Sequence, residues 1–208
     1  MNKRNSTKNV PSHLMKKFNL ILASASPRRK DLLKTLGVPF EIKVSDTDET
    51  RLQGESPRDY VKRLALQKAQ NVSQLLKPDL PTYILGADTT VALGDEIFGK
   101  PENEACARDI LTKLSGTTHE VLTGYAIIGF PSEIKALGVV SSFVSFRKLK
   151  PDEIDSYIET KEPFDKAGAY AMQGKAKNFV EKIEGSLHNI VGLPVEELKV
   201  EFARLGLI

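Results

Sequence analysis

Residues 20–29, which read LILASASPRR, combine the side chains and the backbone turn that bind phosphate. An apolar run suited to a buried strand gives way to small residues, and Ser26 with the proline after it marks a helix start. Free backbone N–H groups and the positive end of the helix dipole attract anions there. Further donors come from the hydroxyl and guanidinium groups of Ser24, Ser26, Arg28 and Arg29. This stretch therefore predicts a phosphate site.

The two arginines are the informative part of this stretch. Positive charge at a helix N-terminus opposes the macrodipole by about 0.3–1 kcal/mol, so Arg28 and Arg29 make local sense mainly if an anion binds. The alternative is that both arginines are solvated and that Ser26 only starts a helix. The stretch is not a P-loop, because the GxxxxGK[ST] spacing is absent.

Lysines and carboxylates elsewhere in the chain supply the other groups that phosphoanhydride chemistry needs. The lysines stand beside small or rigid residues and could bind phosphate oxygens: Lys68, Lys100 and Lys166. The carboxylates could hold Mg²⁺: Glu49 with its neighbours Asp46 and Asp48, Asp88, and Asp165. A metal bridges phosphate oxygens and offsets transition-state charge, while a carboxylate orients or deprotonates water.

Asp88 is the predicted general base. It follows the apolar run at residues 83–85 and a glycine, the place where α/β sheets carry active-site groups. Plainer interpretations stay open at this point: Asp88 as a turn former, residues 46–49 as a solvated loop, and the lysines as ordinary surface residues. The histidines are scattered along the chain, so a zinc site or a Ser-His-Asp triad has little support.

Helical and strand patterns alternate along the chain, which is typical of an α/β fold. Helices are expected at residues 27–36, 57–76 and 103–114, from residue 151, and after residues 192–194. Strands are expected at residues 20–22, 40–44, 83–85, 119–128, 134–149 and 179–183, with a hairpin at Gly94. Residues 162–170 break both periods and are predicted to form a functional loop.

The composition limits the class of protein. The chain has 208 residues, 40% hydrophobic and 27% charged, which is ordinary for a folded protein with a sizeable core. No apolar run approaches the roughly 20 residues that cross a bilayer, so no membrane partner is expected. The single cysteine, Cys106, excludes an internal disulfide and fits a reducing compartment.

The net charge of +3 comes from the N-terminus. Residues 1–17 carry five basic residues and no acidic one, so the rest of the chain carries a net charge of −2. We therefore expect a disordered basic tail at residues 1–17 and one folded domain at residues 18–208, with Met15 as a candidate start. A basic character confined to the tail predicts no nucleic-acid partner.

Eight short motifs, in order along residues 19 to about 205, resemble those of the Maf family of nucleoside triphosphate pyrophosphatases. They are SASPRR (24–29), DET (48–50), RLALQKA (63–69), GADTTV (86–91), GKP (99–101), EPFDKAGAY (162–170), QG (173–174) and GLP (192–194). The resemblance implies the α/β fold shared with inosine triphosphate pyrophosphatases: a long, twisted, mixed sheet with flanking helices, two lobes and a central cleft. It also implies a cytoplasmic, metal-dependent and dimeric enzyme.

The motifs are similar to those of the subgroup that acts on dTTP and UTP. Its marks are Arg28, Thr89 and Gln173. The subgroup that acts on 7-methyl-GTP typically has Trp-Arg in the first motif and Ser-Glu-Gly in place of Gln-Gly. One departure is Lys175, since a second glycine usually follows the Gln-Gly pair. By this resemblance, Gln173 and Arg28 read the base and its attached phosphates.

The sequence as a whole predicts a pyrophosphatase that hydrolyses dTTP and UTP to the monophosphate and pyrophosphate, a house-cleaning activity that could extend to modified pyrimidine nucleotides. Glu49 and Asp88 are expected to hold Mg²⁺, for which Mn²⁺ or Co²⁺ could substitute. The predicted substrate-binding residues are Ser24, Ser26, Arg28, Arg29, Lys68, Thr89, Lys100, Lys166 and Gln173. The alternatives are a 7-methyl-GTP pyrophosphatase and a non-catalytic nucleotide-binding regulator of septum formation.

Overall fold

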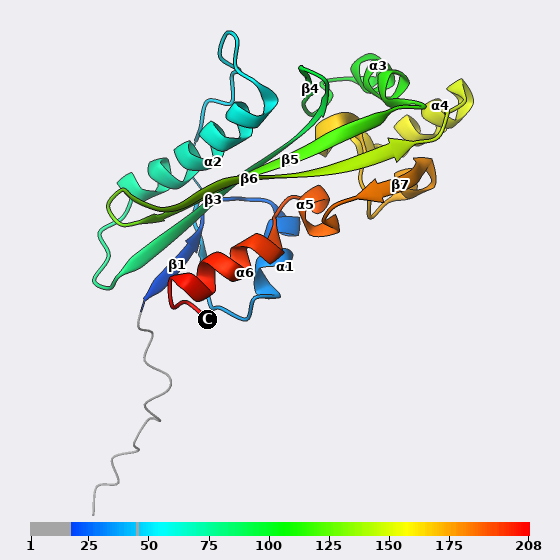
Figure 1. The fold of residues 1–208 in the computed structure, drawn as a ribbon. Coiled ribbons are helices and arrows are strands. Elements are labelled where there is room, and N and C mark those ends of the chain that lie inside the picture. Colours follow the sequence, from blue (N-terminus) through cyan, green and yellow to red (C-terminus); the bar gives the residue numbers. More distant parts are fainter. Residues whose placement is uncertain (1–17, 45) are drawn as a thin grey trace, which may run out of the picture.

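The computed structural model describes residues 18–44 and 46–208. The predicted basic tail at residues 1–17, and the candidate start at Met15 within it, lie outside the described residues. The described part of the chain forms a mixed α/β structure, as the sequence predicts (Figure 1).

Seven strands in the described residues make one mixed sheet that runs the length of the molecule (Figure 1). They are β1 (Asn19–Leu22), β2 (Glu41–Ile42), β3 (Thr82–Leu93), β4 (Glu96–Phe98), β5 (Thr118–Gly129), β6 (Glu133–Phe146) and β7 (Val180–Glu184). The order is β2-β1-β3-β5-β6-β7, and β4 pairs with β3. The pairs β1–β2 and β1–β3 are parallel and the others antiparallel, so the predicted mixed sheet is confirmed.

Helices cover both faces of this sheet (Figure 1). They are α1 (Pro27–Lys34), α2 (Pro57–Gln74), α3 (Glu104–Leu114), α4 (Pro151–Glu159), α5 (Leu187–Val191) and α6 (Val195–Arg204). Short 3₁₀ turns follow α4: η2 (Glu162–Asp165), η3 (Ala167–Ala169) and η4 (Lys175–Phe179). The expected helices are all present, and α5 was not predicted because one short turn carries no clear periodicity.

Alternation along β1 divides the core between the two faces of the sheet. Leu20 and Leu22 pack in one cluster with residues of α1 and α6, whereas Ile21 and Ala23 pack in another with residues of α2. A separate cluster joins α3 and α4 to the start of β5 and the end of β6. Two groups of helices therefore lie at two ends of one sheet, which gives the predicted two lobes.

Two glycines allow α2 to lie close to the sheet. A Cβ atom at Gly86 would lie 2.1 Å from the backbone oxygen of Ala65, and one at Gly124 would lie 2.2 Å from that of Val61. Only a residue without a side chain fits at either point. This close approach brings the middle of α2, which carries Lys68, against the middle of β3.

Three predicted strands differ from the structure. The strand expected at residues 134–149 ends at Phe146, the last residue of β6. The strand at residues 83–85 does not end before Asp88: β3 continues to Leu93, because residues 83–92 all pair with β5. Asp88 therefore lies inside a strand, and its interpretation as a turn former is wrong. The half-buried strand expected at residues 40–44 shrinks to the exposed pair of residues in β2, because this segment pairs only with the end of β1 at the sheet edge.

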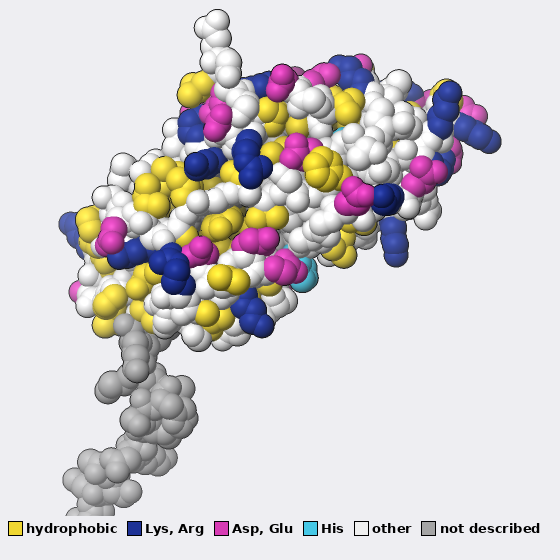
Figure 2. All heavy atoms as spheres, viewed as in Figure 1, with side chains coloured by type: hydrophobic (Ala, Val, Ile, Leu, Met, Phe, Trp, Pro, Cys, Tyr) yellow, Lys and Arg dark blue, Asp and Glu magenta, His cyan; other side chains and the backbone are white. Residues whose placement is uncertain are grey.

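The surface carries charges of both signs. On the face shown in Figure 2, basic and acidic side chains are interspersed with apolar ones. Among the residues with a described structure, none of the helices has both the length and the apolar character needed to cross a bilayer.

Candidate active site

One cavity of about 900 Å³ brings together all the predicted catalytic, substrate-binding and metal residues, whereas Asp48, considered beside Glu49 for Mg²⁺, is not among the residues that line it. Its lining includes Ser24, Ser26, Arg28, Arg29, Glu49, Lys68, Asp88, Thr89, Lys100, Lys166 and Gln173. We call the side formed by residues 24–29 with Glu49, Lys68 and Asp88 the charged wall. The side formed by residues 162–174 is the far wall. The shared cavity is a finding, while the role of each residue stays a prediction.

The predicted helix start on the charged wall is confirmed. Ser26 is the N-cap of α1, and its Oγ accepts a hydrogen bond from the backbone N–H of Arg29 at 3.4 Å. The buried hydroxyl of Ser24 accepts from the backbone N–H of Ser26 at 3.2 Å. Residues 23–29 line the cavity, so the N-terminal turn of α1 is exposed to whatever binds there.

Arg29 ties three segments of the chain together beneath this turn. Its guanidinium donates to the backbone oxygen of Gly192 at 2.8 Å, to Thr89 Oγ1 at 3.0 Å and to Ser24 Oγ at 3.3 Å. Burial lowers the pKa of Arg29, and the negative charge of Asp88 opposes this shift. Arg29 therefore has protein partners that explain its presence without an anion, and its role in binding substrate stays a prediction.

Arg28 is the more open of the two arginines. Its Nη1 atom lies 3.6 Å from Oδ2 of Asp165 on the far wall, a distance of ion pairing without a tight hydrogen bond. The Asp165 side chain is 69% exposed. A phosphate oxygen that entered the cavity could take over this weakly held guanidinium.

Lys68 lies between two carboxylates at the centre of the charged wall. Its Nζ atom is 2.6 Å from Oε1 of Glu49 and 2.6 Å from Oδ1 of Asp88. The Lys68 side chain is 15% exposed and that of Asp88 is 10% exposed. The solvated-surface interpretation of Lys68 is therefore wrong.

The two carboxylates have opposite pKa shifts. Burial raises the pKa of Asp88, and the nearby charges of Lys68 and Arg29 oppose this only in part. Burial also acts upward on Glu49, but its hydrogen bond to Lys68 and the surrounding positive charges lower its pKa overall. Neighbouring carboxylates with separated pKa values suit different tasks: one stays ionised and the other exchanges a proton.

The far wall consists of turns that carry both exposed and buried side chains: the side chain of Lys166 is 15% exposed, and Tyr170 is buried. Lys166 contacts Asp165, and Gln173 is exposed. Behind Gln173, Oε2 of Glu162 accepts a hydrogen bond from the backbone N–H of Lys175 at 3.2 Å. A Cβ atom at Gly174 would fall 1.7 Å from Oε1 of Glu162, so a side chain at this position would displace the carboxylate that supports the Gln-Gly turn.

Comparison with known proteins agrees with this arrangement. Residues 19–205 match the family model described as "Maf-like protein". The chain belongs to the Maf family. The predicted resemblance is thereby confirmed, and the Maf motifs occupy key points of the site: SASPRR begins α1, RLALQKA lies within α2 and GADTTV lies within β3.

Curated members of the Maf family resemble nearly the whole chain. A protein of Clostridioides difficile (strain 630) named dTTP/UTP pyrophosphatase is 46% identical over 181 residues, 87% of this chain and 92% of the relative. A protein of the same name from Geotalea uraniireducens (strain Rf4) is 47% identical over 192 residues, 92% and 97% of the two chains. Another, from Anaeromyxobacter dehalogenans (strain 2CP-1 / ATCC BAA-258), is 48% identical over 192 residues, 90% and 94% of the two chains.

Glu49 and Asp88 are the side chains that could hold a metal in this Maf protein. Both carboxylates converge on one cationic nitrogen of Lys68, so they are close enough to share a cation. The described residues contain no group of three or more His, Cys, Asp or Glu side chains placed to hold a metal. Mg²⁺ usually takes one or two carboxylates and completes its shell with water and substrate phosphates. The pair therefore fits a metal that binds together with a triphosphate.

Tyr60 lines the cavity but was missed in the sequence. Its hydroxyl donates to the backbone oxygen of Glu49 at 2.9 Å. Burial, together with the charges of Asp88 and Glu49, raises the pKa of Tyr60 to about 12, so it remains a donor. The spacing of residues in α2 could have indicated Tyr60. It precedes Lys68 by slightly more than two helical turns, which puts both side chains on one side of the helix.

Proposed function

We propose that this protein hydrolyses nucleoside triphosphates to the monophosphate and pyrophosphate, with dTTP and UTP as preferred substrates. Relatives that are 46–48% identical over most of the chain carry the name dTTP/UTP pyrophosphatase, which supports the substrate class. The residues of the cavity support the reaction class, because they combine cations for phosphate oxygens with carboxylates for a metal and a water.

The observation that carries the proposal is the position of Lys68. Its ammonium group joins Glu49 and Asp88 inside the cavity that the N-terminal turn of α1 also lines. A binding protein for phosphate needs the turn and the cations, whereas two carboxylates beside them, the buried Asp88 and the half-exposed Glu49, add electrostatic repulsion toward an anion. Their presence is explained if they hold a metal or accept a proton during hydrolysis.

In this proposal the triphosphate lies along the N-terminal turn of α1, with Arg28, Lys68 and Lys100 as counter-charges. Asp88 orients a water and accepts its proton as the water attacks the anhydride between the α- and β-phosphates. Pyrophosphate then leaves from the cationic side of the cavity. Mg²⁺ on Glu49 and Asp88 would supply Lewis-acid stabilisation of the phosphate oxygens, with Mn²⁺ or Co²⁺ as substitutes.

Base choice is assigned to the far wall. A glutamine side chain offers one carbonyl acceptor and one amide donor, which match N3–H and O4 of uracil or thymine. Thymine differs from uracil by one methyl group, which a pocket discriminates by only about 1–3 kcal/mol. Both dTTP and UTP are therefore expected to be substrates, read by Gln173.

A substrate panel with pyrophosphate detection tests the proposal. We expect Mg²⁺-dependent turnover of dTTP and UTP, and a loss of about 10²–10⁴ in kcat for Asp88→Asn, which keeps the shape but cannot act as base. Preference for 7-methyl-GTP would support the other Maf subgroup. Nucleotide binding without any turnover would support a non-catalytic regulator.

We also propose that the protein is a homodimer in the cytoplasm and binds neither nucleic acid nor membrane. The family resemblance supports these expectations, and the catalytic argument does not depend on them. Sedimentation at several protein concentrations tests the dimer, and cell fractionation tests the location.

A further inference from the structure

The segment that carries Glu49 has no regular backbone structure of its own. Residues 46–55 connect β2 to α2 and form neither helix nor strand. The Glu49 side chain is 55% exposed, yet its carboxylate lies 2.6 Å from the ammonium of Lys68. Because loops without such support sample many conformations, this geometry requires contacts that hold the loop.

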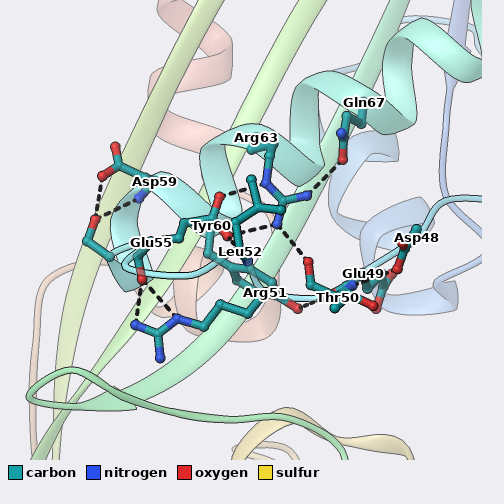
Figure 3. A network of polar contacts seen from close by, with 11 residues as sticks. Asp48, Glu49, Thr50, Arg51, Leu52, Glu55, Asp59, Tyr60, Arg63 and Gln67 are labelled. Atoms are coloured by element: carbon teal, nitrogen blue, oxygen red, sulfur yellow. Dashed lines mark hydrogen bonds and ion pairs between the residues drawn. The ribbon is translucent and has the colours of Figure 1, made fainter.

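A nearly buried ion pair joins the end of this loop, at Glu55, to Arg63 of α2 (Figure 3). Nε of Arg63 is 2.6 Å from Oε1 of Glu55, and Nη2 is 2.8 Å from Oε2, so the guanidinium and the carboxylate meet through two parallel bonds. The Glu55 side chain is only 7% exposed. Such a fork is directional as well as strong, and it gives Arg63 one orientation.

Both partners of this ion pair also bond to the middle of the loop (Figure 3). Nη2 of Arg63 donates to the backbone oxygen of Thr50 at 3.1 Å. Oε2 of Glu55 accepts from the backbone N–H of Leu52 at 3.1 Å. Tyr60 adds the hydrogen bond to the backbone oxygen of Glu49. The backbone of Glu49 and that of its next neighbour are therefore both held from α2.

The same helix carries Lys68. Tyr60, Arg63 and Lys68 all belong to α2, and Nη1 of Arg63 also donates to Gln67 at 3.0 Å. The element that presents the ammonium between Glu49 and Asp88 thus also sets where Glu49 stands. A small movement of the loop would separate the two carboxylates, although neither Arg63 nor Glu55 is among the residues that line the cavity.

We propose that Arg63, oriented by Glu55 and assisted by Tyr60, is a positioning residue that holds Glu49 where it can bind the metal of a metal–triphosphate substrate. The inference rests on the proposed function for the role of Glu49. A purely structural ion pair would contribute to stability and leave the metal requirement of the enzyme unchanged. A positioning pair changes the metal requirement in a protein that is still folded.

Two substitutions and two readouts separate these cases. Arg63→Lys keeps the charge but cannot form the fork, and Tyr60→Phe removes only the hydroxyl. Loss of groups that orient a metal ligand typically costs about 10–100-fold in metal affinity or activity. We expect a rise of that order in the Mg²⁺ concentration for half-maximal pyrophosphate release from UTP with Arg63→Lys, and a smaller rise with Tyr60→Phe. The KM for UTP at saturating Mg²⁺ should stay unchanged.

The second readout does not depend on turnover. Binding of Mn²⁺ in the presence of a non-hydrolysable UTP analogue, followed by electron paramagnetic resonance, should weaken in the same order. The matched control is Arg147→Lys in the other lobe, where Arg147 forms a similar fork with Glu153 at 2.6 and 3.0 Å. We expect the control to lower the melting temperature and to leave both metal readouts at the wild-type value.

Unchanged Mg²⁺ requirement and Mn²⁺ affinity in the folded variants would overturn the proposal, as would an equal shift in the Arg147→Lys control. If Arg63→Lys does not fold, the Mg²⁺ requirement and the Mn²⁺ affinity of Tyr60→Phe decide whether the positioning role holds. If the wild type releases no pyrophosphate, the proposed function fails, and the Mn²⁺ titration alone judges the positioning role.

Discussion

The two walls of the cavity are held together in different ways. On the charged wall the functional side chains bond to one another: Lys68 joins Glu49 and Asp88, and Arg29 joins Ser24 to Thr89. On the far wall, Gln173 and Asp165 are exposed, and the turn is held from behind by the carboxylate of Glu162. The charged wall is thus a preorganised network, whereas the far wall pairs Lys166 with Asp165 and presents Gln173 on a supported turn.

This difference suggests a division of labour. Stabilising developing charge requires groups that are already fixed, because their reorganisation would cost free energy during the reaction. Reading a base requires matching donors and acceptors on a surface that the substrate can reach. Changes on the charged wall should therefore affect all nucleotides alike, and changes on the far wall should affect the choice among them.

The largest effect on substrate binding is expected from the centre of the charged wall. Lys68→Ala removes charge-assisted bonds worth about 1.5–3 kcal/mol, which corresponds to a rise of about 10–100-fold in KM for every triphosphate. Steady-state kinetics with UTP and CTP measure this. A variant in which only one of the two nucleotides is affected would contradict the proposed division.

Acid should destabilise the far wall through His119. Nε2 of this buried residue shares a hydrogen bond with the hydroxyl of Tyr170, which lines the cavity. Burial lowers the pKa of His119 to about 4. Because the unfolded value is about 6.5, only the unfolded chain gains the proton at first. The contribution of neutral His119 to stability is complete at a pH above its pKa in the unfolded chain. It is lost as the pH falls toward its pKa in the folded protein.

The expected loss from His119 is about 2 kcal/mol in the free energy of unfolding between about pH 7 and about pH 5. Urea denaturation of the wild type and of His119→Gln at both pH values separates the loss due to His119 from the loss due to protonation of carboxylates. If the two proteins lost the same free energy, His119 would not be the responsible group.

A smaller effect should sharpen the assignment of the far wall. The wild type is expected to favour UTP and dTTP over CTP and purine triphosphates by at least about tenfold in kcat/KM, which corresponds to about 1.4 kcal/mol or more. Gln173→Glu should abolish this preference, because a carboxylate cannot donate to O4. Competition assays with mixed triphosphates measure the ratio, and unchanged selectivity would remove Gln173 from base reading.

The N-terminal tail should have no effect on either wall. The sequence of residues 1–14 offers little to bury and precedes the first strand. A protein that starts at Met15 is expected to match the full chain in melting temperature and in UTP turnover. A clear loss of either quantity would give the tail a structural role.

Local signals made the charged wall partly predictable. The N-cap at Ser26 and the start of α1 depend on neighbouring residues, so the sequence predicts them correctly. The contact of Lys68 with Asp88 depends on the close packing of α2 against β3, which no local pattern reveals. The continuation of β3 through Asp88 depends on pairing with β5, and for that reason the expected end of the strand was wrong.

The sequence pattern located the loop of the far wall, but the role of Gln173 was predictable only through the family resemblance. Residues 162–170 break the helical and the strand periods, which indicates a loop but gives no geometry. The support of the Gln-Gly turn by Glu162 joins residues that are separated by short 3₁₀ turns, and nothing in their spacing predicts that contact. The role of Gln173 in reading the base comes from the family resemblance and remains a prediction.

Binding of pyrophosphate, a ligand without a base, tests the division between the walls most directly. Isothermal titration of pyrophosphate with Mg²⁺ into the wild type, Arg28→Ala and Gln173→Glu gives the three dissociation constants. Arg28→Ala should weaken binding by about tenfold or more, since a charge-assisted bond to phosphate is lost, whereas Gln173→Glu should bind as the wild type does. Unchanged affinity in Arg28→Ala, or an equal loss in Gln173→Glu, would contradict the assignment of phosphate to one wall and base to the other.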